Sequence, residues 1–256
     1  MTDAGHVEVS ISHFPKLKDN YLFIDVEKCK VGRATGDLFF RKDADFVITQ
    51  ADHDSIIKRT LQHVPADRVI CDFFTWDYAL EKLRNPDTWG SLLAKLKENG
   101  VSNLSGMDFS IFYDQPDIIS LYNLYHNLLK SRIAQDRGFD IVLNWNWIQT
   151  RYEPVYQKCL PTEIPCLVMD LNHFQTKETQ QYNAAAFAML TGICDIRYIV
   201  IQSGSKSLVQ FAPLIASIKQ HNIKYITIPS QSVLLPRVTQ TQRHAKARQA
   251  SDDSTD

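Results

Sequence analysis

The sequence predicts an α/β protein in which repeated strand–helix units form a TIM-like barrel, regular or irregular, with an open parallel sheet as the alternative. Seven apolar runs rich in β-branched residues begin near residues 45, 68, 101, 139, 165, 196 and 223. Runs that are apolar on both faces are typical of parallel strands, and their alternation with helices indicates a parallel sheet. Seven such strands in 256 residues favour a barrel, within a single domain over residues 1–236.

The first 44 residues or so are predicted to form a short β segment ahead of the repeats. Alternating apolar and polar residues predict a strand over 7–14, and a second apolar run predicts a strand over 20–26. Gly32 and Gly36 lie on either side of a basic residue, which predicts a turn into a third short strand within 30–40.

The repeats then follow in order. Strands are predicted over 45–50, 68–74, 101–109, 139–147, 166–174, 196–204 and 223–230, and helices over 52–64, 76–83, 87–99, 117–138, 177–192 and 207–222. In the first helix Ile56, Ile57 and Leu61 share one face. Pro86 breaks the second helix, and Gly100 and Gly138 suit the left-handed residue that ends a helix.

Composition excludes several classes of protein. The 28 Lys and Arg residues balance the 29 Asp and Glu residues, which argues against a strongly basic nucleic-acid binder but leaves a local basic patch open. Five cysteines without CxxC spacing, and no HxH or HExxH pair, argue against a zinc knuckle and a histidine-rich metal centre, and the cofactor stays unknown. No apolar run approaches the ~18 residues of a membrane span, and the first residues do not predict a secretory signal. We therefore expect no membrane partner and a cytoplasmic location.

Polar residues follow the predicted strands, where the working face of a parallel α/β fold lies. Asp108 and Asp170 come directly after apolar runs and are candidate catalytic acids, bases or metal ligands. Ser110, Asn146 and Asn172 stand beside them as candidate ligand-binding residues. Helix capping or an Asx turn is the alternative for each, and it is the preferred interpretation for Asp72 and Asn144.

The run from 202 to 207 is the best candidate for a phosphate site. Ser203, Gly204, Ser205 and Lys206 join a predicted strand to a helix, so free N–H groups and the lysine can face an anion. A capped helix without a ligand explains the same residues. No GxGxxG or GxxxxGK[ST] motif is present, so the two best-marked nucleotide-binding folds have no support.

The amino-acid composition of the chain changes after residue 236. Residues 237–256 carry a basic stretch and then an acidic end without apolar periodicity, which predicts a disordered polar tail. A solubilising terminus is one interpretation. The other is a basic arm in which Arg243, Lys246 and Arg248 contact nucleic acid or an acidic partner.

From about residue 68 to 206 the chain resembles an uncharacterised family, a domain of unknown function found in bacteriophages, plasmids and bacteria. The resemblance rests on the Asp-Phe-Ser piece in MDFSIFYDQP, on NLYHNLLKSRIAQDRGFDIVLNWNW and on IVIQSG. The matching positions are Asp108, Phe109, Ser110, Pro116, Tyr125, Arg132, Gly138, Trp147 and Gly204. It implies a phage or mobile-element origin in a bacterial host, without an established activity. It also draws attention to Arg132, as an ion-pair partner of Asp108 or half of an anion or nucleotide site.

Two functions are expected from these observations. The first is a phage or mobile-element protein that binds nucleic acid or a host protein, since no strong catalytic motif is present and the tail is basic. The alternative is an enzyme that acts on a nucleotide or other phosphorylated small molecule through the strand-end carboxylates. The sequence leaves the oligomeric state open.

Overall fold

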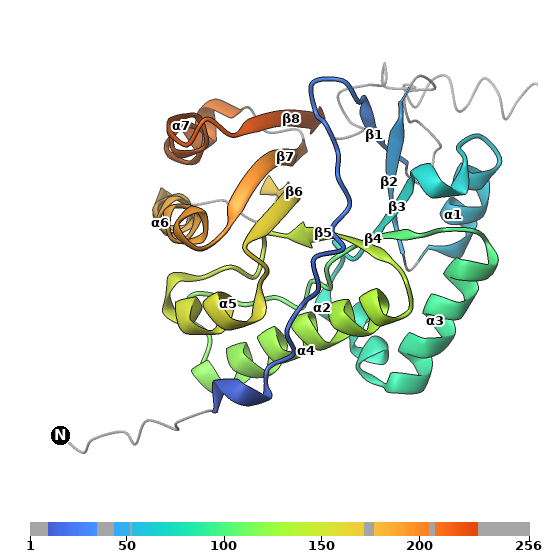
Figure 1. Cartoon of the computed structure of the whole chain (residues 1–256), viewed down its shortest axis with the longest axis horizontal. Coiled ribbons are helices and arrows are strands. Elements are labelled where there is room, and N and C mark those ends of the chain that lie inside the picture. Colours follow the sequence, from blue (N-terminus) through green and yellow to red (C-terminus); the bar gives the residue numbers. More distant parts are fainter. Residues whose placement is uncertain (1–9, 35–43, 52, 172–176, 205–207, 230–256) are drawn as a thin grey trace, which may run out of the picture.

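The computed structural model describes residues 10–34, 44–51, 53–171, 177–204 and 208–229, and within them eight parallel strands form one sheet in chain order. The strands are β1 Val31–Arg33, β2 Phe46–Gln50, β3 Val69–Asp72, β4 Asn103–Ser105, β5 Asp140–Asn144, β6 Glu163–Asp170, β7 Asp195–Gly204 and β8 Lys224–Pro229. The sheet curls into a nearly closed barrel (Figure 1), with an unsealed seam between β1 and β8. This confirms the predicted TIM-like barrel over the open sheet.

Helices alternate with the strands and pack around the barrel (Figure 1). They are α1 Asp54–Leu61, α2 Asp77–Leu80, α3 Pro86–Glu98, α4 Asp117–Asp136, α5 Glu153–Cys159, α6 Lys177–Ile193 and α7 Ala212–Gln220. Single 3-10 turns lie at η2 Ala66–Arg68, η3 Glu81–Arg84, η4 Thr150–Tyr152 and η6 Leu208–Phe211. The short helix α5 was not predicted, because its seven residues carry too little periodicity.

Local chemistry sets the ends of α3 and α4. Asn85 caps α3 by accepting bonds from the backbone N–H groups of Asp87 and Thr88, and Pro86 follows at the first helical position. Gly100 and Gly138, with φ of 80° and 77°, end α3 and α4 in the left-handed region.

Strand register sorts side chains between the lumen and the outer core. Inside the barrel Ile48, Ile70, Val142, Val168 and Val200 form one apolar cluster, while the alternate residues of the strands pack outward under the helices. Two residues further along the same strands, the lumen-facing positions turn polar: they are Gln50, Asp72, Asn144, Asp170 and Gln202. The barrel therefore has an apolar floor and a polar layer at the carboxyl ends of its strands.

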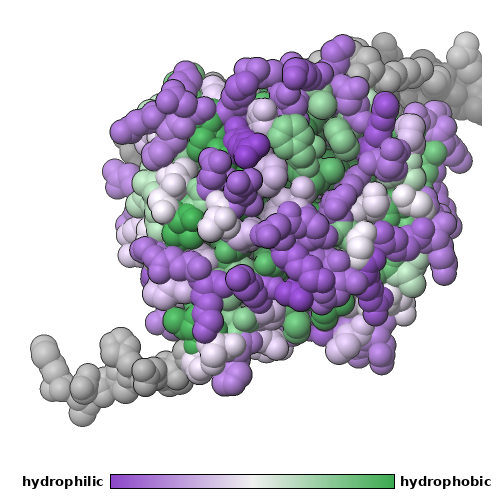
Figure 2. Space-filling model, in the orientation of Figure 1, coloured by the Kyte–Doolittle hydropathy of each residue, from purple (hydrophilic) through white to green (hydrophobic). Residues whose placement is uncertain are grey.

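The segment from Asn20 to Cys29 closes the amino end of the barrel. The Leu22 N–H donates to the Ile141 carbonyl at 2.8 Å, and Ile24 and Val26 are buried in the lumen cluster. The blue segment crosses the front of the barrel in Figure 1, and Figure 2 shows that the same face carries mainly hydrophilic side chains. The predicted strand over 20–26 is therefore wrong, because Tyr21 alone makes a bridge, to Ile141.

The first predicted strand, over 7–14, is also wrong where it can be compared. Ile11–His13 form a 3-10 turn (η1), in which the N–H groups of His13 and Phe14 donate to the carbonyls of Ser10 and Ile11. These local bonds replace a strand ladder, and residues 7–9 lie outside the described residues. Within 30–40, β1 occupies Val31–Arg33, where the turn around Gly32 was predicted, and the strand predicted after that turn lies outside the described residues.

Candidate active site

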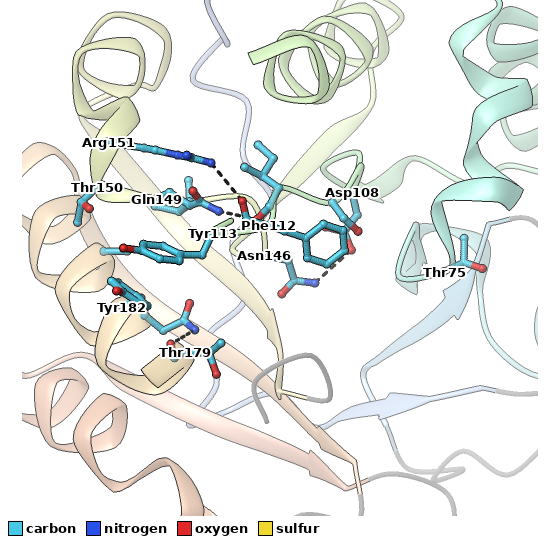
Figure 3. Close-up of a pocket in the computed structure, with 15 residues that line it drawn as sticks. Thr75, Asp108, Phe112, Tyr113, Asn146, Gln149, Thr150, Arg151, Thr179 and Tyr182 are labelled. Carbon is cyan, nitrogen blue, oxygen red and sulfur yellow. Dashed lines mark hydrogen bonds between the residues drawn. The ribbon is translucent and has the colours of Figure 1, made fainter. Parts of the chain in front are cut away.

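A pocket of about 180 Å³ lies at the carboxyl end of the barrel (Figure 3). Its wall comes from the segments that follow β3, β4 and β5 and from the first half of α6. The residues that line it include Asp108, Ser110, Tyr113, Asn146, Gln149 and Tyr182. Enzymes with parallel barrels carry their active sites on this face, so the pocket is the candidate active site.

Asp108 is the buried acid of this pocket, with 5% of its surface exposed. Its Oδ2 accepts a hydrogen bond of 3.1 Å from the Asn146 amide, as Figure 3 shows, and its buried Oδ1 has no partner. Burial raises the pKa of Asp108 well above its usual value, the side-chain amides of Asn146 and Asn144 lower that pKa in part, and the charge of Asp170 raises it further. The environment therefore favours the neutral, protonated carboxyl.

Two side-chain amides act on the carboxyl group of Asp108. Oδ2 accepts from the Asn146 amide N–H, and the Asn144 amide also lowers the pKa of the group. Asn146 is held in turn, since its N–H donates to the Asn144 side chain at 2.9 Å and its Oδ1 accepts from the Asp170 N–H at 3.4 Å. A network of side-chain amides therefore positions the carboxyl group of Asp108.

Helix α4 holds the backbone around Asp108 in place. Asn123, Asn127 and Ser131 lie four residues apart, on one face of the helix. The Asn127 side chain accepts from the Phe109 N–H at 2.8 Å and donates to the Phe109 carbonyl at 2.9 Å. Asn123 donates to the Ser110 carbonyl at 2.7 Å, and Ser131 accepts from the Met107 N–H at 3.3 Å. These hydrogen bonds from α4, called the α4 ladder, fix the backbone on both sides of Asp108.

Replacing Asn127 by alanine should lower the free energy of unfolding by about 2–4 kcal/mol, because both backbone groups of the buried Phe109 would lose their partner. Urea unfolding measures the change. Asn99→Ala is the control, since that amide bonds the Lys95 carbonyl at an exposed helix end and should cost under about 1 kcal/mol. Equal losses in the two variants would contradict a special role for Asn127.

Aromatic rings form the mouth of the pocket. Tyr113 and Tyr182 stack with their ring centroids 3.9 Å apart and an interplanar angle of 23° (Figure 3). Ile111, Ile148 and Ala186 add apolar wall beside them. The arrangement suits contact with the face of a flat ring.

Arg151 lines the same pocket, but its bonds lie within the protein. Its Nη1 pairs with Asp117 at 3.0 Å, and its Nη2 donates to the Phe112 carbonyl and to Ser120, both at 3.1 Å. Among the described residues that line the pocket it is the sole Lys or Arg. Its charge is therefore balanced, and it braces the loop that carries Phe112.

The structure brings four of the predicted site residues together. Asp108, Ser110 and Asn146 line the pocket, and Asp170 lies behind Asn146 at the end of β6. The backbone N–H and the hydroxyl of Ser110 both donate to the Asp77 carboxylate at 3.0 Å. Asp77 itself was not predicted as part of the site.

The expected role of Arg132, as a partner of Asp108 or part of an anion site, is wrong for this pocket. It neither pairs with Asp108 nor lines the pocket. Its Nε bonds Asp136 at 3.1 Å, and its Nη1 donates to the Lys16 carbonyl at 2.6 Å. Arg132 lies on a different face of α4 from the ladder and ties that helix to the N-terminal segment.

Asp72 and Asn144 make the predicted Asx turns, and Asp72 has a second role. Asp72 accepts from the Phe74 N–H at 3.3 Å, and Asn144 accepts from the Asn146 N–H. The buried Asp72 also forms an ion pair of 2.9 Å with Arg33 of β1 across the lumen. Burial raises the pKa of Asp72, and the guanidinium of Arg33 offsets part of that effect. Arg33 also donates to the Gln202 amide oxygen.

The predicted phosphate site and tail stay predictions. Ser203 is buried near the end of β7, and Gly204 ends that strand. Asn172, Ser205, Lys206, Arg243, Lys246 and Arg248 lie outside the described residues. In the part of the chain that is described, no three His, Cys, Asp or Glu side chains gather in a way that could hold a metal ion.

Comparison with known proteins does not assign the chain to a family. No protein-family model matches the sequence, and neither the curated proteins nor the solved structures contain a match. The resemblance to the uncharacterised phage and plasmid family therefore stays a prediction. Within the described residues, every helix is too short or too polar to span a membrane.

Proposed function

We propose that the protein is an enzyme that acts on a small molecule with a flat ring, and that Asp108 is its general acid. The observation that carries this proposal is the buried carboxyl group of Asp108, a residue of the pocket wall whose pKa is raised well above its usual value by burial. A carboxyl group kept neutral by burial can give its proton to a bound substrate at neutral pH. Asp170 supports this role, because its charge holds the proton on Asp108.

The size of the pocket limits the part of the substrate that enters it. A cavity of about 150 Å³ is enough to hold benzene, so about 180 Å³ accommodates one six-membered ring with small substituents. The stacked pair of Tyr113 and Tyr182 at the mouth favours a flat ring. Nucleosides and nucleotides are the first substrates to test, with the base in the pocket and the rest of the molecule outside.

The phosphate half of the expected substrate has less support than the ring half. Arg151, the cation of the described pocket wall, already pairs with Asp117. The proposal therefore rests on recognition of the ring and not on recognition of a phosphate.

Conversion of a panel of nucleosides and nucleotides, followed by mass spectrometry, tests the proposal. Asp108→Asn should lower the turnover of any accepted substrate by about a hundred- to ten-thousand-fold, because an amide cannot deliver a proton. Asp140→Asn is the matched control, since Asp140 begins β5 at the opposite end of the barrel and should leave turnover unchanged. Equal turnover in the wild-type and Asp108→Asn proteins would rule out Asp108 as the acid.

Binding of nucleic acid or of a host protein stays a second proposal. It is favoured by the exposed rings of Trp76, Tyr78 and Phe112, which lie after β3 and β4, because exposed aromatic rings stack on unpaired bases. If residues 237–256 form a basic arm, their removal should weaken binding of a single-stranded oligonucleotide and flatten its dependence on salt. Unchanged affinity and salt dependence, measured by fluorescence anisotropy, would exclude the arm.

A further inference from the structure

We propose that a second copy of this chain covers an exposed aromatic surface beside the pocket, so that the protein forms a two-fold symmetric dimer. The inference goes beyond the proposed function and does not depend on the chemistry at Asp108. The surface consists of large apolar side chains that follow β3 and β4 or lie in the first two turns of α4. Each is between 45% and 79% exposed, and together they are called the α2–α4 surface: Trp76, Tyr78, Phe112, Ile118, Ile119 and Tyr122.

Contacts between neighbouring elements make this surface continuous. Asp77 of α2 accepts from the backbone N–H and from the hydroxyl of Ser110 at 3.0 Å, which joins the start of α2 to the segment after β4. The guanidinium carbon of Arg84 in η3 lies 4.6 Å from the centre of the Tyr122 ring, and Arg84 donates to Asn123 at 2.7 Å. Figure 1 shows α2 beside α4. The exposed side chains therefore belong to one region of the protein surface.

The size of the α2–α4 surface is close to that of a protein interface. A large aromatic side chain can bury about 150–250 Å², so its four partly exposed rings present roughly 500 Å². The isoleucines add to this area. The largest apolar patch of a typical monomer covers about 300–600 Å², whereas each partner in a standard interface buries about 800 Å². Trp and Tyr are also the residues that contribute most to binding at interfaces.

The charges on the α2–α4 surface favour a second copy over a nucleic acid. Glu81 pairs with Arg84 at 2.8 Å, and Asp117 pairs with Arg151 at 3.0 Å. The described side chains around the rings thus carry no excess of positive charge, which a polyanion would require. Two copies of a chain with a net charge of −1 repel each other little, and two-fold dimers are the commonest assemblies of soluble proteins.

The second copy would also cover one side of the pocket. Phe112 belongs to the α2–α4 surface and lines the pocket, where Figure 3 shows it near Asp108. A partner packed on Phe112 would shield that side of a bound ligand from water. The dimer would therefore complete the pocket wall.

Sedimentation equilibrium of the full-length chain tests the inference. We expect twice the mass of one chain, with a dissociation constant in the micromolar range or below, as interfaces of this size show. The double variant Tyr78→Lys with Ile118→Lys should raise that constant at least about a hundredfold, because each charge would be buried twice in a two-fold interface. Both side chains are mostly exposed in one chain, so the fold should be unaffected. Phe23→Lys is the matched control, since this half-exposed ring lies at the amino end of the barrel and should leave the mass unchanged.

Trp76 provides a second readout. It is 72% exposed, whereas the other tryptophans, Trp89, Trp145 and Trp147, are buried. Acrylamide should therefore quench mainly the fluorescence of Trp76, and quenching should increase when dilution separates the dimer. Trp76→Phe should remove this dependence on protein concentration.

The outcomes separate the second copy from other occupants. A wild-type chain that stays monomeric at about 100 µM would overturn the inference. A dimer that persists in the double variant would use another surface, which overturns it as well. A monomeric chain that binds a single-stranded oligonucleotide, and binds it more weakly after Trp76→Ala, would assign the rings to nucleic acid instead.

Discussion

The Asp108→Asn variant is expected to be more stable than the wild-type protein at pH 7, with a free energy of unfolding about 1–2 kcal/mol higher. Asp108 is buried, and burial raises its pKa well above the usual value. At neutral pH, ionisation of this carboxyl lowers the free energy of the unfolded chain, whereas the folded protein must keep the group neutral or bury a charge. Asparagine removes this penalty and can keep the contact with Asn146 after its amide groups reorient.

The pH dependence of that difference tests its cause. Because the pKa is raised in the folded state, the neutral carboxyl adds full stability below the unfolded pKa of about 4, and this contribution is lost as pH rises toward the folded pKa. The wild-type and Asp108→Asn proteins should therefore converge near pH 4 and diverge as pH rises. Urea unfolding at a series of pH values measures this, with Asp140→Asn as the control. A difference that does not change with pH would exclude protonation of Asp108 as its source.

Arg33→Met is expected to lower the free energy of unfolding by about 3–5 kcal/mol, because it leaves the buried carboxylate of Asp72 without its counter-ion. The double variant Arg33→Met with Asp72→Leu should recover most of the loss, since no buried charge then remains. The pair would thus contribute less to stability than the single variant suggests.

Arg197→Met provides the matched control for that experiment. Arg197 pairs with Glu163 at 3.2 Å, but both side chains are more than half exposed, so its loss should cost under about 1 kcal/mol. Chemical denaturation of the four proteins compares them directly. If Arg33→Met were no worse than Arg197→Met, or if the double variant stayed as unstable as the single one, Asp72 would not be a buried charge that depends on Arg33.

The barrel and its working face were predictable because each rests on a strong local signal. Apolar β-branched runs mark parallel strands, and the residues just after them must lie at one end of the barrel. That argument alone pointed to Asp108, Ser110 and Asn146, which line one pocket. It could not find Tyr113 and Tyr182, which come from different units of the fold and meet only once the barrel is complete.

Other parts of the site carry weaker signals. Strand β1 has three residues, too few for periodicity, so the ion pair from Arg33 to Asp72 could not be foreseen. Arg132 was misplaced because a resemblance gives a residue but not the helix face on which it lies. The ladder on α4 did leave a trace: Asn123, Asn127 and Ser131 repeat at intervals of four residues and are all buried. A polar stripe on a buried helix face indicates backbone that needs partners.

The segment that closes the amino end of the barrel also constrains how the chain folds during its synthesis. Glu27 bonds Lys224 at 2.7 Å across a separation of 197 residues, and Leu22 bonds the backbone of Ile141. The ribosome makes this segment before its partners in β5 and β8, which emerge much later. Contacts between such distant residues slow folding, so in a nascent chain Ile24 and Val26 stay without their final neighbours until those strands have been made.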